Sequence, residues 1–157
     1  MDLSTLPVLN QETIRDDYLD VMGHMNVRWY IVIFDDASWH FFASFGMDES
    51  YFQRENCGAF ALWQCIHYLA EICAGEQVSV HGRLLGHSEK RFHFMLFMFN
   101  ETSGKVAATM EVLAAHIDLE KRRMTPVPSQ ITTQMDAILA EHEQLDWKAP
   151  VIGVLLP

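Results

Sequence analysis

The group of residues best suited to chemistry lies between Asp20 and Asn26, in the run Asp-Val-Met-Gly-His-Met-Asn. It combines a carboxylate, a glycine that permits a tight turn, an imidazole and an amide. The apolar segment that follows predicts a helix, whose first N–H groups have no partner within it and could polarise a carbonyl. Asp20 could then act as a nucleophile or as a general base for water, which is the chemistry of acyl transfer or hydrolysis.

The same run also allows a purely structural interpretation. Asp20 could accept a turn amide, Asn26 could cap the helix, and His24 could be a hydrogen-bonded loop histidine. Other catalytic patterns are absent from the sequence, which has no Gly-x-Ser-x-Gly and no glycine-rich phosphate loop. The histidines at 81, 87 and 93 are six residues apart, which is not a helical metal-ligand spacing, so we expect no metal and no cofactor.

The elements around the motif predict one α+β domain. Residues 26–45 hold thirteen apolar positions out of twenty, and a helix that is apolar on most sides belongs in a core or under a sheet. The strands expected downstream are separated by short turns, which favours antiparallel pairing. We expect strands at 11–19, 59–68, 77–86, 91–99 and 106–118, a short helix at 48–55, and a last helix capped by Ser129.

The expected strand at 91–99 is apolar on both of its faces, so it needs cover on both sides. The central helix can cover one face. The C-terminal helix or a partner subunit could cover the other.

Length and composition restrict the class of protein. The chain has 157 residues, enough for one domain with a sizeable core. Acidic residues outnumber basic ones by 21 to 11, which disfavours binding to nucleic acid or to anionic membranes. Three cysteines, no secretory signal and no apolar run long enough for a membrane span favour free thiols and a cytoplasmic location.

The motif Asp20-x-x-Gly-His-Met-Asn-x-x-x-Tyr30, followed by Phe34-Asp-x-Ala37, resembles the 4-hydroxybenzoyl-CoA thioesterase family of hotdog-fold proteins. The longer run from Tyr18 to Asn26 is similar to a branch associated with carnitine and betaine catabolism. The resemblance covers residues 11–142 and includes the later segments Phe60-Ala-Leu, His67-Tyr-Leu and His116-Ile-Asp-Leu.

This resemblance implies a five-stranded antiparallel sheet wrapped around a long central helix, with a C-terminal helix, in a homodimer or homotetramer. It implies an acyl-CoA thioesterase that hydrolyses a small acyl-CoA to the free acid and CoA, with no metal. The residues implied in catalysis are Asp20, Gly23, His24 and Asn26, and those expected to bind substrate are Met25, Tyr30, Trp63, His67, Lys90, Arg91 and Arg122, the basic ones holding the CoA phosphates.

The chain departs from the family pattern in one strand. The nearer branch often carries an acidic residue followed by a histidine where this chain has Trp63, Gln64 and Cys65. Trp63 could offer a π-face to a quaternary ammonium group, or it could pack against the central helix.

Two other functions stay open from the sequence alone. One is a non-catalytic hotdog module that binds acyl-CoA or mediates assembly. The other is a hotdog dehydratase with its acid on the central helix, at Asp35 or Asp36.

Overall fold

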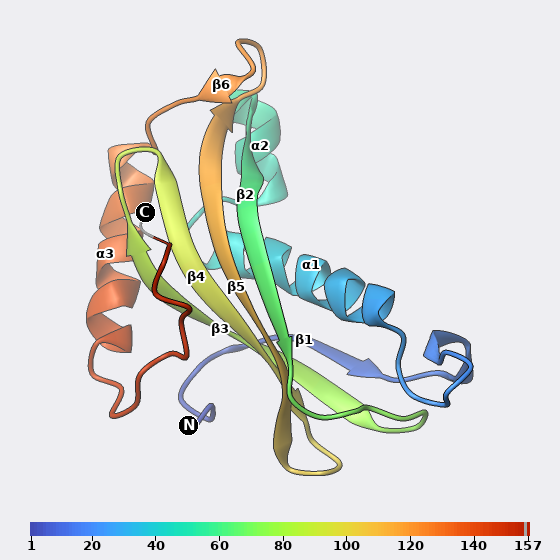
Figure 1. The fold of residues 1–157 in the computed structure, drawn as a ribbon. Coiled ribbons are helices and arrows are strands. Elements are labelled where there is room, and N and C mark those ends of the chain that lie inside the picture. The colour runs from blue at the N-terminus through green and yellow to red at the C-terminus, as the bar shows by residue number, and fades with distance from the viewer. Residues whose placement is uncertain (156) are drawn as a thin grey trace.

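The computed structural model describes residues 1–155 and 157, which form a curled antiparallel sheet around one long helix (Figure 1). The strand order is β1-β3-β4-β5-β2, and a short β6 pairs with the end of β5. The predicted α+β architecture is therefore confirmed. The strands are β1 (Val8–Thr13), β2 (Cys57–Tyr68), β3 (Gln77–His87), β4 (Arg91–Asn100), β5 (Lys105–Asp118) and β6 (Arg123–Met124), and the helices are α1 (Val27–Ser44), α2 (Glu49–Glu55) and α3 (Ser129–His142).

The first strand is where the prediction was wrong. The strand expected at 11–19 lies at Val8–Thr13, and a 3-10 turn, η1, follows at Asp16–Tyr18. The acidic residues of this turn have low strand propensity, and Arg15 pairs locally with Asp17 at 2.9 Å. The other four predicted strands agree with the structure to within two residues, whereas β6 was not predicted.

A smaller correction concerns the start of α3. The N-cap is Pro128, which has no side-chain oxygen to offer, so Ser129 is the first helical residue and not the cap.

The helix α1 lies across the concave face of the sheet and packs its inward side into the core. Phe41 of this side packs on Phe94 of β4, and Phe42 packs on Phe92. The close approach of α1 to β3 depends on Gly82, since a Cβ there would lie 2.7 Å from the Phe41 ring. This packing fixes where α1 begins, and therefore where the Asp20 motif lies.

The outer face of the sheet is covered by segments near both ends of the chain. Leu3 and Leu6 pack on Met95 and Phe97, together with Leu145, Trp147 and Ala149. The second face of the strand predicted at 91–99 is therefore covered by these terminal segments, and not by α3 or a partner subunit as predicted. These segments lie outside residues 11–142, the range over which the sequence resembles the family. α3 lies beside β3 instead, with Ile131 and Met135 in the inner core.

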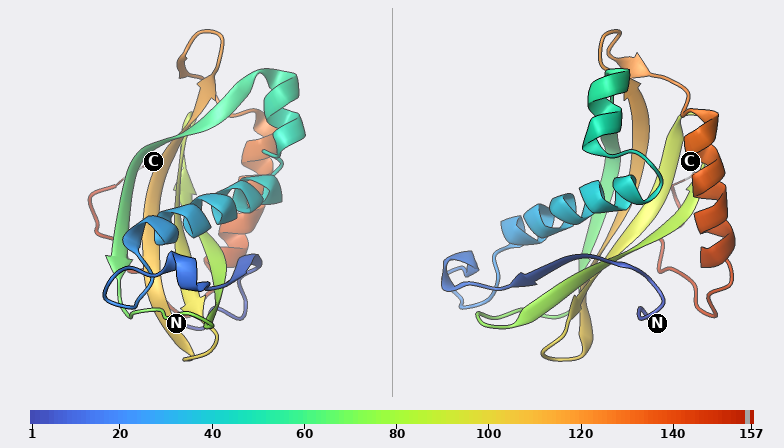
Figure 2. Two further views of the ribbon diagram at one scale, coloured as in Figure 1. Left: turned by 90° about the vertical axis from the view of Figure 1, so that its right-hand side faces the viewer. Right: turned by 180° about the vertical axis from the view of Figure 1, so that it is seen from behind.

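The strand β2 is an edge strand. It pairs with β5 on one side, and no described strand pairs with its other side. Phe60, Leu62 and Tyr68 of this strand are exposed. The left view of Figure 2 looks onto this edge, where the first turns of α1 also project.

No helix in the described part of the chain is both long and apolar enough to cross a bilayer.

Candidate active site

The Asp20 motif forms a tight turn between η1 and α1. One carboxylate oxygen of Asp20 accepts the Met22 amide at 2.8 Å, and the Asp20 amide donates to the His24 carbonyl at 2.9 Å. Gly23 has φ of +88°, a left-handed conformation that favours glycine. The turn is held at its base by the bridge between Leu19 and Met25. The structural role foreseen for Asp20 is therefore real, and it engages only one of the two carboxylate oxygens.

The second oxygen of Asp20 faces His24. Its distance to His24 Nδ1 is 3.5 Å, and the two side chains are 18% and 31% exposed. Asp20 is therefore both held in place and partly open to solvent. A carboxylate in this state can take a proton from water or attack an electrophile.

Most backbone amides of the motif are already used. Gly23 donates to the Asp20 carbonyl, Met25 to Ile72, and Asn26 to Tyr18. The Asn26 side chain caps α1 by accepting the Arg28 amide at 3.1 Å, as its structural interpretation predicted.

Three amides at this turn have no hydrogen-bond partner within the described residues, those of Val21, His24 and Val27. The amides of His24 and Val27 are the two nearest the start of α1. Both lie at the positive end of the α1 dipole, where a carbonyl oxygen that gains charge is stabilised.

A groove of about 360 Å³ opens beside this turn. Asp20 itself does not line it, but His24, whose ring lies 3.5 Å from the Asp20 carboxylate, does, and we call this hollow the Asp20 groove. Met25 and Tyr30, both predicted to bind substrate, line it. Burial raises the pKa of Tyr30 to about 12, so its hydroxyl stays protonated. The Tyr30 ring meets the edge of Tyr68 at 5.0 Å. The groove is lined by His24, Met25, Val27, Tyr30, Tyr68, Leu69, Ala70 and Glu71.

Tyr68 and Glu71 were not among the predicted site residues. Tyr68 pairs with Ala108 of the inner core and so shares the face of α1, but the bulge earlier in β2 conceals this face from the strand period.

Trp63 and His67 lie on the other face of the sheet. Trp63 pairs with Leu113, which pairs with His93, and His67 pairs with Thr109, which pairs with Phe97 of the outer cluster. Directly opposed residues point to the same face, so both side chains point away from α1. Trp63 thus does not pack against the central helix, and neither residue lines the Asp20 groove. The bulge between Ala61 and Trp63 produces this change of face.

The basic residues expected to bind phosphate lie at the opposite end of the sheet from the Asp20 groove. Arg91 pairs with Ala115, whereas Tyr68 pairs with Ala108, seven residues away along β5. At about 3.3 Å per residue this separation is about 23 Å. Arg122 lies beyond the end of β5, in the turn to β6 with φ of +52°. One copy of the chain therefore does not bring these residues to Asp20.

A second hollow lies at that opposite end, and we call it the aromatic cavity. It measures about 790 Å³ between the second half of α1, α2 and the start of β2. Trp39 and Phe52 form two of its walls, with their rings at 87° and their centroids 5.7 Å apart. Asp48 and Glu49 add acidic groups at the start of α2.

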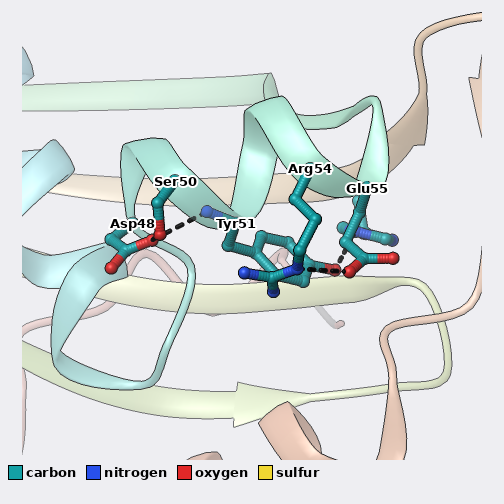
Figure 3. Close-up of polar contacts among 6 residues, drawn as sticks. Asp48, Ser50, Tyr51, Arg54 and Glu55 are labelled. Carbon is teal, nitrogen blue, oxygen red and sulfur yellow. Dashed lines mark hydrogen bonds and ion pairs between the residues drawn. The ribbon is translucent and has the colours of Figure 1, made fainter.

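Next to Phe52, a wall of the aromatic cavity, Tyr51 belongs to a buried hydrogen-bonded chain. His116 Nδ1 lies 3.2 Å from the Thr125 carbonyl, which can only accept, so Nε2 accepts the Tyr51 hydroxyl at 2.9 Å. Burial lowers the pKa of His116 and raises that of Cys57, which keeps both groups neutral. Figure 3 shows Tyr51 on α2, with Asp48 and Ser50 at the helix start and the Arg54–Glu55 pair at its end.

The described residues contain no cluster of His, Cys, Asp and Glu arranged to hold a metal ion. Asp35 and Asp36, the acids of the dehydratase alternative, are both exposed on α1, and neither lines a hollow described above.

Comparison with known proteins agrees with this fold. The thioesterase-like superfamily matches residues 14–135. The betainyl-CoA thioesterase of Pseudomonas aeruginosa is 26% identical over 82% of this chain and 81% of that protein. The L-carnitine dehydrogenase/betainyl-CoA thioesterase of Agrobacterium fabrum is 28% identical over 86% of this chain, which spans only 28% of that protein.

Among solved structures, a Staphylococcus aureus protein in complex with CoA has a TM-score of 0.82 at 24% identity, covering 91% of this chain and 90% of that one. The fold is thus the hotdog fold of thioesterases. The chain belongs to the thioesterase-like superfamily, as the resemblance in its sequence predicted, and thioester hydrolysis is the activity of its class.

Proposed function

We propose that this chain hydrolyses an acyl-CoA thioester with Asp20 as the reacting carboxylate. The observation that carries the proposal is the pairing of a half-engaged carboxylate with two free amides, from His24 and Val27, at one helix start. The thioester carbonyl would accept from these amides, and Asp20 would approach its carbon. Membership of the thioesterase-like superfamily supports the assignment.

Two routes satisfy the chemistry. Asp20 attacks the carbonyl carbon, CoA leaves as its thiolate, and water then hydrolyses the acyl-aspartyl anhydride. Alternatively, Asp20 takes a proton from water, the hydroxide adds to the carbonyl, and collapse expels the thiolate. A burst of thiol release equal to the enzyme concentration would indicate the first route.

The proposed substrate is a betainyl-type acyl-CoA. The support is the name of the two relatives and the similarity over more than four-fifths of this chain. The small volume of the Asp20 groove, about 360 Å³, also suits a short acyl group.

The proposed assembly is a homodimer formed along the edge strand β2. Exposed apolar side chains surround this edge, among them Leu62 on β2, Ile31 on α1 and Met22 at the tip of the Asp20 turn. A long free edge with apolar neighbours is a place for pairing with a second chain. Antiparallel pairing with a two-fold copy would also bring Lys90, Arg91 and Arg122 of the second chain toward Asp20, where CoA phosphates need positive charge.

The test is thiol release from a panel of short straight-chain, aromatic and betainyl CoA esters. We expect the wild-type protein to release CoA, and Asp20→Asn to lower kcat about a thousandfold, within the range for loss of a catalytic base or nucleophile. The thermal melting temperature should stay close to that of the wild type, because asparagine keeps an oxygen for the Met22 amide.

Asp136→Asn, on the exposed face of α3, is the matched control and should retain full activity. Unchanged turnover in Asp20→Asn would contradict the mechanism. Thermal stabilisation by acyl-CoA without thiol release would favour the non-catalytic binding module instead.

A further inference from the structure

The aromatic cavity has the walls of a site for an organic cation. Trp39 is half-exposed at 50%, and its ring stands nearly perpendicular to that of Phe52, so the two rings form a corner. A cation that lacks N–H donors is held by such ring faces and not by hydrogen bonds. The exposure of Trp39 leaves its ring available to a ligand.

The charges around the cavity have the matching sign. Asp48 and Glu49 line it, and no lysine or arginine does so in the described part of the chain. The Ser50 hydroxyl and the Tyr51 amide donate to Asp48 and lower its pKa, so this carboxylate stays ionised (Figure 3). The nearest cation on α2, Arg54, is paired with Glu55 at 2.8 Å.

The cavity is too far from Asp20 of the same chain to hold its acyl group. Twelve residues of α1 separate Val27 from Trp39, which is about 18 Å along the helix. A betainyl group places its quaternary nitrogen only two bonds from the carbonyl carbon. If this cavity serves catalysis, it must therefore serve the Asp20 groove of another chain.

The two-fold pairing of β2 proposed above would bring the aromatic cavity of one chain next to the Asp20 groove of the other. Full overlap of the two antiparallel strands sets Tyr68 of one chain beside Cys57 of the other. Tyr68 lines the Asp20 groove and Cys57 lines the aromatic cavity. Both hollows lie on the α1 side of the sheet, so they face each other across the pairing.

We propose that the aromatic corner of Trp39 and Phe52, with Glu49 beside it, binds the quaternary ammonium of an acyl group whose thioester is hydrolysed at Asp20 of the partner chain. This assignment rests on the proposed thioesterase function and adds the residues that select its substrate. It moves the cation-binding role foreseen for Trp63 to a different tryptophan, on the opposite face of the sheet.

The test compares two esters that differ by one atom and one charge. Betainyl-CoA carries a trimethylammonium group, and 3,3-dimethylbutanoyl-CoA has the same shape with carbon in place of nitrogen. Trp39→Leu should lower kcat/KM for betainyl-CoA about tenfold and leave the neutral ester within about twofold. Glu49→Gln should lower kcat/KM for betainyl-CoA about threefold, again with little change for the neutral ester.

The control variants are Trp63→Leu, on the outer face of β2, and Glu143→Gln, an exposed acid after α3 that lines neither hollow. Both should behave as the wild type with either ester. Equal losses on the two esters in Trp39→Leu and Glu49→Gln, or no loss in either variant, would overturn the assignment while leaving the thioesterase function intact. Absence of thiol release from both esters by the wild-type protein, with release from another ester of the panel, would overturn the assignment alone. Absence of release from every ester of the panel would overturn the function itself, and the assignment with it.

Discussion

The two ends of the edge strand β2 are built in different ways. At the Tyr68 end, the Asp20 turn offers a partly exposed carboxylate, free amides and a small groove. At the Cys57 end, a buried Tyr51–His116 chain lies beside a larger cavity with aromatic and acidic walls. One end has groups that can break a bond, and the other has groups that can recognise a ligand. Tyr30, Tyr68 and Glu71 give the Tyr68 end aromatic and acidic groups too, but its groove is the smaller of the two, and we propose that a working site takes one end from each of two chains.

Disrupting the pairing of two β2 strands should cause the largest loss of activity expected from this comparison. Leu62 is exposed on β2 near the middle of the strand, so Leu62→Lys would place two charges together at the two-fold contact. We expect the proposed dimer to dissociate and kcat/KM to fall about a hundredfold, although Leu62 lines neither hollow. Light scattering coupled to size exclusion gives the mass, and thiol release gives the activity.

The opposite edge strand offers a matched control. Val8 of β1 is also exposed at a sheet edge, so Val8→Lys adds the same charge away from both hollows. It should keep the mass and the activity of the wild type. A fully active Leu62→Lys monomer would contradict a site shared between chains.

A smaller effect is expected of pH on stability, through the buried histidine His116 at the Cys57 end. Burial lowers the pKa of His116, so the folded state favours neutral imidazole, while the unfolded chain takes up a proton near the ordinary value of 6.5. Below that pH the unfolded state therefore binds more protons than the folded state. The free energy of unfolding accordingly decreases as the pH falls through and below 6.5. His142 adds in the same direction, because burial also lowers its pKa.

We therefore expect the melting temperature to fall by a few degrees between pH 7.5 and 5.5. His142→Asn keeps an acceptor for the Leu84 amide and removes one titrating group, so its melting temperature should change less with pH. A wild-type melting temperature that rises on acidification would show that the buried histidines do not control this range.

The sequence predicted the scaffold well because its patterns are local. The apolar run of α1, the turns between strands and the alternation within them each depend on neighbouring residues. The turn role of Asp20 and the cap role of Asn26 were also predicted, since a turn followed by a helix start is visible in the chain.

What the sequence could not predict depends on register and on distance in space. The bulge between Ala61 and Trp63 changes the face of every later side chain in β2, and it leaves no mark in composition. The corner of Trp39 and Phe52 joins two different helices, and periodicity gives no sign that their rings meet. Arg122 was expected to hold CoA phosphates, and only the strand register shows how far it lies from Asp20.

The central claim is that Asp20 and Trp39 act together only across two chains. The most direct test is a mixed dimer of one Asp20→Asn chain and one Trp39→Leu chain, each with a different tag and purified through both. One of its two sites then has an intact Asp20 and an intact partner Trp39. The account predicts about half of the wild-type activity on betainyl-CoA, well above either parent dimer. Activity no higher than the average of the two parent dimers would place both residues in one chain's own site and contradict the account.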